Sequence, residues 1–235
     1  MENEFEKENE LEQEDIIDNE EVTVEEEKKF NLKKEITEWL VAIVVAVVVA
    51  FVVRTFFFTL VTVDGQSMDN TLQHGQKLVI SRFNYTPEQG DIVVFTPDLH
   101  PDTPFIKRVI ATEGQTVDVD SRGVVYVDGK VYEEDYILGN SVVGKVPSYY
   151  VDFPITVPED CVFVMGDNRE HSHDGRAIDV SSVKENPEPE DYYTFQHSYD
   201  GMVTKPLYYG CVHEDDIMGK AVLRFWPFSE FGGLN

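Results

Sequence analysis

Ser67 and Lys107 are the two side chains in this sequence best suited to chemistry. Ser67 lies in residues 63–68, shortly after a long apolar segment, and Lys107 lies in residues 105–110, an otherwise strand-like run. A serine hydroxyl needs a base to become a nucleophile at neutral pH. A lysine can be that base when burial lowers its pKa enough to leave the amine neutral. The pair therefore predicts a hydrolase in which the serine attacks and the lysine accepts its proton.

The strand pattern indicates how the pKa of Lys107 would be lowered from about 10.4, its ordinary value. Side chains alternate along a strand, so Phe105, Lys107 and Val109 are expected on one apolar face, with Arg108 pointing the other way, to solvent. Two alternatives remain open on this pattern alone. Lys107 could be a surface lysine whose ammonium stays in water, and Ser67, which follows a glycine closely, could be an ordinary turn residue.

An apolar run precedes the pair and would hold it at a membrane. Residues 39–53 are 15 consecutive apolar residues, and the apolar character resumes at residues 56–58. A spanning helix needs about 20 mostly apolar residues, so residues 36–58 are predicted to form a transmembrane helix. A cleaved signal peptide would place this run nearer the start, and a pair of strands would not be so long without a break.

The segment before this helix is strongly acidic. Residues 1–35 hold 15 acidic residues against 5 lysines, a net charge of −10. Such a segment cannot bury enough apolar surface to offset its ordering entropy, so it is predicted to be a disordered tail, with a solvated helix as the alternative. Four lysines cluster just before the helix and only Arg54 follows closely. The positive-inside rule therefore predicts a cytoplasmic tail, with residues 59–235 outside the cytoplasm.

Composition argues against a nucleic-acid site and against a zinc site held by cysteines. The net charge of −26 over 235 residues excludes a nucleic-acid binder that works by general phosphate attraction. The two cysteines, Cys161 and Cys211, lack the spacing of a zinc site. They are predicted to be buried thiols, with a disulfide as the alternative outside the cytoplasm.

Beyond residue 60, short β-branched runs alternate with turn signals, and no long period of 3.6 residues follows. This pattern predicts a mostly antiparallel β body. Residues 113–158 are a candidate small β subdomain, with a hairpin that turns at Asp128 and Gly129. Residues 177–207 are turn-rich and acidic and then aromatic, which fits either a partly ordered loop or disorder.

Four stretches, in the same order, resemble the boxes of bacterial type I signal peptidases. They are residues 65–72 (GQSMDNTL), 89–95 (QGDIVVF), 105–111 (FIKRVIA) and 165–176 (MGDNREHSHDGR), and the family's C-terminal strand is matched by 217–221 (IMGKA) and 224–228 (RFWPF). The resemblance covers about residues 39–235, less 177–207. It implies a signal-peptidase-like β catalytic body behind one N-terminal transmembrane helix.

The resemblance also implies the chemistry. The protein would be a serine endopeptidase that removes N-terminal signal peptides from exported preproteins through a Ser-Lys dyad and an acyl-enzyme. Ser67 would be the nucleophile and a backbone oxyanion donor, Lys107 the general base, and Met68 a substrate-binding residue. Supporting residues, which orient the lysine, brace the site or shape its loop, would be Ser172, Asp174, Arg176, Gly166, Asp167, Asn168 and Arg169.

The resemblance implies no cofactor and no metal. The implied partners are exported preproteins and the lipid bilayer, with an association with the secretion machinery and no nucleic acid. The implied location is the cytoplasmic membrane of a bacterium, crossed once.

The chain departs from the family pattern in three places. Asn70 stands where the family usually has proline, and Gly175 stands where it has the serine of Asp-Ser-Arg. Both changes are expected to loosen the backbone near the site. Residues 177–207 resemble an insertion beside the site, which could be a lid, a substrate-selecting flap or a partner surface.

Other functions stay open at this point. His171, His173 and Asp174 could instead belong to a Ser-His-Asp triad or a metal site. A self-cleaving repressor-type Ser-Lys peptidase is a second candidate, although the apolar segment and the lack of a DNA-binding helix pair argue against it. A membrane-tethered β-rich binding module that has lost catalysis is a third, motivated by the three departures.

Overall fold

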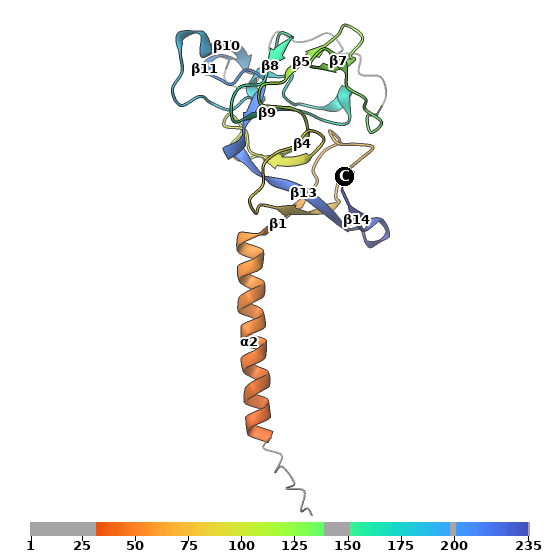
Figure 1. The fold of residues 1–235 in the computed structure, drawn as a ribbon, viewed down its shortest axis with the longest axis vertical. Coiled ribbons are helices and arrows are strands. Elements are labelled where there is room, and N and C mark those ends of the chain that lie inside the picture. The colour runs from red at the N-terminus through yellow and green to blue at the C-terminus, as the bar shows by residue number, and fades with distance from the viewer. Residues whose placement is uncertain (1–31, 139–150, 198–200, 235) are drawn as a thin grey trace, which may run out of the picture. The chain divides into compact units, whose positions relative to one another are not determined.

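The computed structural model describes residues 32–138, 151–197 and 201–234 (Figure 1). The chain divides between Val47 and Val48 into two compact units. The predicted acidic tail, apart from residues 32–35, lies outside the described residues.

One long helix, α2 (Leu32–Phe56), contains residues 36–56 of the predicted membrane segment. Among the described residues it is the one helix long and apolar enough to cross a membrane, over the 19 residues Glu35–Val53, none of which is buried. The predicted segment ran to Phe58, but this residue begins the first strand, where it pairs with Ser81. Its apolar side chain suits either element, and pairing with a neighbouring strand decides between them.

In the described part of the chain, an eight-stranded antiparallel sheet forms the body, which confirms the predicted fold class. The strand order is β1-β2-β13-β3-β4-β9-β12, and β14 pairs with β13. The strands are β1 (Phe58–Thr62), β2 (Lys77–Ser81), β3 (Ile92–Phe95), β4 (Phe105–Thr112), β9 (Cys161–Met165), β12 (Cys211–His213), β13 (Ile217–Trp226) and β14 (Gly232–Gly233).

A second, four-stranded sheet has the order β7-β6-β5-β8. Its strands are β5 (Thr116–Val119), β6 (Val125–Val127), β7 (Lys130–Val131) and β8 (Ile155–Thr156). The predicted hairpin joins β6 to β7 through Asp128 and Gly129, which have φ angles of 52° and 71°. Two successive positive φ angles match the twist of the flanking strands and make the tight turn possible.

In the stretch 177–207 the described residues form secondary structure; residues 198–200 lie outside the described ranges. It begins with the short 3-10 helix η2 (Ile178–Val180) and continues through η3 (Pro189–Asp191) into a hairpin of β10 (Tyr192–His197) and β11 (Gly201–Pro206). Figure 1 shows this hairpin beside the small sheet. A bridge between Val183 and Leu207 closes its base. The remaining 3-10 helices are η1 (Arg169–His171), η4 (Glu214–Asp216) and η5 (Phe228–Glu230).

Strand β4 lies inside the large sheet, between β3 and β9, and is covered on both faces. Three apolar clusters meet along it, because Ile106, Val109 and Ile110 each pack into a different one. Cys161 and Cys211 are buried free thiols in the same core, as predicted. The strand that carries Lys107 is thus held rigidly and kept from water.

Candidate active site

Ser67 and Lys107 are in direct contact. Lys107 Nζ donates a hydrogen bond to Ser67 Oγ at 2.8 Å and another to the Ile106 carbonyl at 3.0 Å. The lysine side chain is buried on β4, whereas Ser67 is half-buried in the loop between β1 and β2. The two residues are forty positions apart, so the fold brings the buried amine to the serine hydroxyl.

Burial lowers the pKa of Lys107 to about 8, and the charge of Arg176 adds to this effect, whereas Asp174 opposes it. The ring of Phe105 covers the amine, with its centroid 5.3 Å from Nζ. With this pKa, roughly a tenth of the lysine is neutral at pH 7. A neutral lysine with its nitrogen against a serine hydroxyl can accept that hydroxyl's proton.

The loop that carries Ser67 is fastened from two sides. Met68 is 2% exposed and packs in the cluster that holds Leu72. Asn168 N donates to the Ser67 carbonyl at 3.0 Å, and its side-chain amide donates to the Gln66 carbonyl at 3.1 Å. The buried Met68 side chain therefore anchors the loop, and this placement does not fit its predicted role in substrate binding.

Asp174 and Arg176 form the expected brace. Arg176 Nε and Nη2 donate to the two Asp174 oxygens at 2.7 and 2.9 Å, and both residues are buried. Burial alone would raise the pKa of Asp174, but Arg176 and the Gly166 N–H hold it well below its ordinary value. Arg176 Nη2 also donates to the Arg169 carbonyl at 2.9 Å, so the ion pair fixes the turn between these residues.

Ser172 and Gly166 meet at the centre of this turn. A Cβ on Gly166 would lie 2.2 Å from Ser172 Oγ and 2.4 Å from the Ser67 carbonyl oxygen, so only glycine fits. Ser172 Oγ is the one buried side-chain polar atom in the described ranges that lacks a hydrogen-bond partner, although it lies close enough to Asp174 to help lower that residue's pKa. Ser172 was expected to help orient Lys107, but the structure shows no hydrogen bond between the two side chains.

Arg108 is buried, and the expectation that it points to solvent is wrong. It is 3% exposed, and its Nε and Nη2 donate to the two Asp167 oxygens at 2.9 and 2.7 Å. Its guanidinium also lies 3.9 Å from the Tyr136 ring centroid. Alternation failed because β4 is an interior strand, which is buried on both faces and need not alternate between apolar and polar surroundings.

Asp167 joins the lysine strand to the serine loop, a connection that the sequence patterns did not reveal. Besides binding Arg108, it accepts a hydrogen bond from Thr71 Oγ1 at 2.5 Å. Thr71 lies four residues after the nucleophile, and Arg108 follows the lysine directly. One feature of the sequence could have indicated this connection. The apolar, β-branched runs that form β3 and β4 are typical of buried strands, and an arginine within such a run needs a buried acidic partner.

The two substitutions expected to loosen the site do not do so. Asn70 has φ +86°, which proline cannot adopt because its ring fixes φ near −65°, and its amide donates to the Tyr136 carbonyl at 3.1 Å. A Cβ on Gly175 would lie 2.6 Å from the Gly210 carbonyl and 2.8 Å from that of Val164. Asn70 is held in place by the hydrogen bond of its side chain. Gly175 has no side chain, which allows the backbone segments around Val164 and Gly210 to approach it closely.

The histidine alternatives do not assemble around Ser67. Asp174 is engaged by Arg176, and His173 Nε2 lies 2.9 Å from Asp179 instead. His171 is exposed in η1. A Ser-His-Asp triad would need an imidazole against the serine hydroxyl, and here the lysine amine occupies that position.

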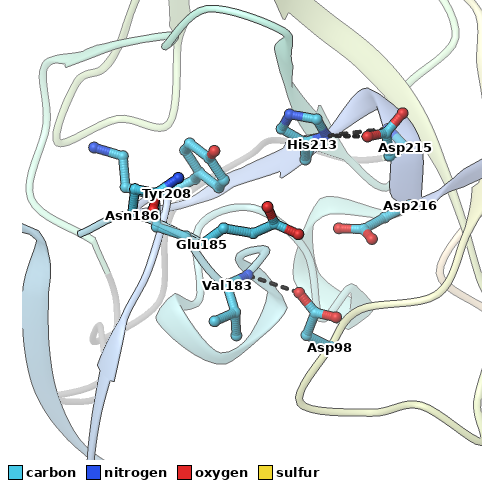
Figure 2. A pocket seen from close by; sticks show the side chains of 9 residues that line it. Asp98, Val183, Glu185, Asn186, Tyr208, His213, Asp215 and Asp216 are labelled. Carbon is cyan, nitrogen blue, oxygen red and sulfur yellow. Dashed lines mark hydrogen bonds and ion pairs between the residues drawn. The ribbon is translucent and has the colours of Figure 1, made fainter.

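A separate hollow of about 540 Å³ lies away from the dyad residues. Figure 2 shows that Asp98, Glu185 and Asp216 approach it from different segments, and Glu185 belongs to the stretch 177–207. Burial and the nearby Asp98 raise the pKa of Asp216. These carboxylates make the hollow acidic. Its lining residues do not include a serine next to a buried lysine, as the dyad does.

Comparisons with known proteins identify the family of this chain. The family model "Signal peptidase, peptidase S26" matches residues 36–226. Signal peptidase IB of Staphylococcus aureus (strain COL) is 33% identical over 215 residues, which cover 85% of this chain and 94% of the relative. Signal peptidase I of Bacillus licheniformis is 38% identical over 157 residues, 64% of this chain and 83% of the relative. A crystal structure of a signal peptidase I from Enterococcus faecalis V583 matches 58% of this chain and 97% of its own, with 25% identity and a TM-score of 0.35.

Proposed function

Because this chain belongs to the signal peptidase family, peptidase S26, we propose that Ser67 and Lys107 are the dyad with which it cleaves its substrates. It is a serine peptidase that removes signal peptides from exported preproteins, and a Ser-Lys dyad is the mechanism of its family. The observation that carries the assignment of residues is the 2.8 Å hydrogen bond between the buried Lys107 Nζ and Ser67 Oγ.

In the proposed reaction, neutral Lys107 takes the proton of Ser67 as Oγ attacks the carbonyl of the scissile bond. The backbone N–H of Ser67 donates to the oxyanion that forms. The lysine then gives its proton to the leaving amine, which becomes the N-terminus of the mature protein. The signal peptide stays on Oγ as an ester until Lys107 deprotonates a water that hydrolyses it.

The surrounding residues act by position. Asn168 holds the serine loop through two hydrogen bonds, and the pairs Asp174–Arg176 and Arg108–Asp167 fix the turn and the strand against it. The Ser172 hydroxyl is buried and has an unused bonding capacity. In our proposal it accepts a hydrogen bond from Lys107 once the amine turns during the reaction.

The chain is membrane-anchored, with α2 as the anchor. We propose the finer setting from the charges that flank the apolar span Glu35–Val53 of this helix: four lysines precede the span and only Arg54 follows it closely. On the positive-inside rule the N-terminus is cytoplasmic and the β body extracytoplasmic, at the cytoplasmic membrane of a bacterium. Confinement to the bilayer plane would concentrate the enzyme with preproteins and bring it near the secretion machinery.

Cleavage of a preprotein at one junction tests this function. The full chain in detergent should cut a preprotein once, after small residues at alternate positions, and Edman sequencing should show the mature N-terminus. A preprotein with a bulky residue immediately before the junction is the matched substrate control and should stay intact. Cleavage at scattered sites, or none, would contradict the assignment.

The rate of cleavage should fall as the pH falls below about 8, the pKa of Lys107. The base must be neutral, so kcat/KM is expected to be level above this pKa and to fall about tenfold per pH unit below it. The measurement is kcat/KM between roughly pH 6 and pH 10, with circular dichroism to check that the fold persists. A rate that does not change over this range would rule out Lys107 as the base.

A further inference from the structure

His100, His173 and Asp179 meet in one place outside the dyad. His173 Nε2 lies 2.9 Å from Asp179 Oδ1, and His100 Nε2 lies 3.4 Å from Asp179 Oδ2. One ligand atom from each of the three residues lies within 4.8 Å of the other two. The three residues come from the loop between β3 and β4, from the turn after η1, and from η2.

We propose that these three side chains bind one divalent metal ion, with Zn²⁺ as the preferred ion. Two imidazole nitrogens and a carboxylate are the ligands of an open zinc site, whose fourth position holds water. Ligand atoms at zinc's bonding distance are about 3.3 Å apart in a tetrahedral site. The two His–Asp contacts, at 2.9 and 3.4 Å, are already near this spacing, and the remaining separations, which are at most 4.8 Å, must shorten by up to about 1.5 Å to admit the ion. Mg²⁺ and Ca²⁺ prefer oxygen ligands throughout and suit this donor set less well.

Burial distinguishes this cluster from the other His–Asp pairs of the described residues. His74 meets Asp64, and His213 meets Asp215, but in both pairs the aspartate side chain is 94% exposed. The Asp179 side chain is 10% exposed and faces two imidazoles. A buried carboxylate shared by two histidines is a preorganised donor set, whereas a solvated single pair is not.

The surroundings of the cluster leave one side open. The ring of Phe105 stacks on His100 at 5.6 Å and meets the edge of His173 at 6.1 Å, which gives the site an apolar wall. The His173 side chain is 42% exposed, so the ion would be reached from solvent on that side. A bound ion would keep a water ligand there.

The ion would also connect the site to the stretch 177–207. Asp179 belongs to that stretch, and His173 stands between Ser172 and Asp174. Phe105, which touches both histidines, also covers Lys107 Nζ at 5.3 Å. A bound ion would therefore fix the base of the inserted stretch and the ring over the lysine. The metal site itself does not depend on the proposed dyad, because binding can be measured without a substrate.

The test is a zinc titration of the untagged full chain in detergent after dialysis against a chelator, followed by calorimetry. We expect one ion per chain, and Co²⁺ should give the visible absorption of a four-coordinate site. His173→Gln and His100→Gln should each weaken binding about 100-fold or more, since changes outside the ligand shell already cost 10–100-fold. His173→Gln is the main variant because this side chain is partly exposed.

His74→Gln is the matched control, since it removes a histidine that also contacts an aspartate. Thermal unfolding without metal shows whether each variant folds, and zinc should raise the midpoint of the wild type and of His74→Gln but not that of His173→Gln. Equal zinc affinity in the wild type and in both cluster variants would overturn the proposal. So would a wild type that binds no stoichiometric ion, which would leave a hydrogen-bonded His–Asp cluster only.

Discussion

Ser67→Ala and Lys107→Met are each expected to lower kcat for preprotein cleavage by at least about 10⁴-fold, the scale of losses when a member of a nucleophilic unit is removed. Ser67→Ala removes the oxygen that lies 2.8 Å from Lys107 Nζ. Lys107→Met keeps an unbranched side chain in the same buried space and removes only the amine. KM should change little, because neither group is needed to hold the peptide.

The double variant should be no worse than the poorer single variant, since two residues that act as one unit do not contribute additively. Ser121→Ala and Lys130→Met are matched controls, because Ser121, in the turn between β5 and β6, and Lys130, in β7, are both exposed. They should cleave at close to the wild-type rate. If either dyad variant kept more than about a hundredth of the wild-type kcat, the assignment of that residue would be wrong.

Arg108→Met is expected to lower the free energy of unfolding by about 3–5 kcal/mol, the usual cost of breaking a buried ion pair. The change leaves Asp167 charged, fully buried and without its bidentate partner. It also frees the carboxylate that holds Thr71 in the serine loop. Activity should therefore fall with stability, because the nucleophile loses part of its support.

Arg122→Met is the matched control for this prediction. Arg122 also reaches its aspartate, Asp120, with two guanidinium nitrogens, but its side chain is 75% exposed. An exposed pair contributes little to stability, so Arg122→Met should lose far less free energy of unfolding than Arg108→Met. Urea unfolding of both variants measures the difference directly. If the two variants lost similar free energies of unfolding, breaking the buried Arg108–Asp167 pair would be no more destabilising than breaking an exposed pair, which would contradict the prediction.

Local sequence patterns were sufficient to predict the main secondary-structure elements and the two residues proposed to react. The apolar run, the hairpin at Asp128 and Gly129, and the ordered boxes around Ser67 and Lys107 are each contained in a few consecutive residues. Alternation within β4 failed for Arg108, because it assumes that one face of the strand meets water. β4 is an interior strand because it pairs with β3 on one side and β9 on the other. This pairing cannot be predicted from a short stretch of sequence, because β9 begins about fifty residues after β4.

The remaining contacts of the site depend on residues far apart in the chain. Asp167 meets Arg108 across 59 positions, and Asn70 meets the Tyr136 carbonyl across 66. His100 meets Asp179 across 79 positions, so the cluster proposed to bind zinc was invisible in the sequence, where only the nearby His171, His173 and Asp174 suggested a metal. The expected looseness at Asn70 and Gly175 was wrong for the same reason, since their packing partners are distant.

The bridge between Val183 and Leu207 divides the stretch 177–207 into two parts that should differ in their tolerance of changes in length. Residues 177–182 are buried and include Asp179, so they are committed to the core. Residues 184–206 begin and end at this bridge, so a change in their length need not alter the strand order of the large sheet. Closing a longer loop also adds little entropic cost. Any replacement must cover the apolar surface that Phe195, Tyr193 and Val203 now cover. Related chains should therefore vary in length beyond the bridge and keep the residues before it.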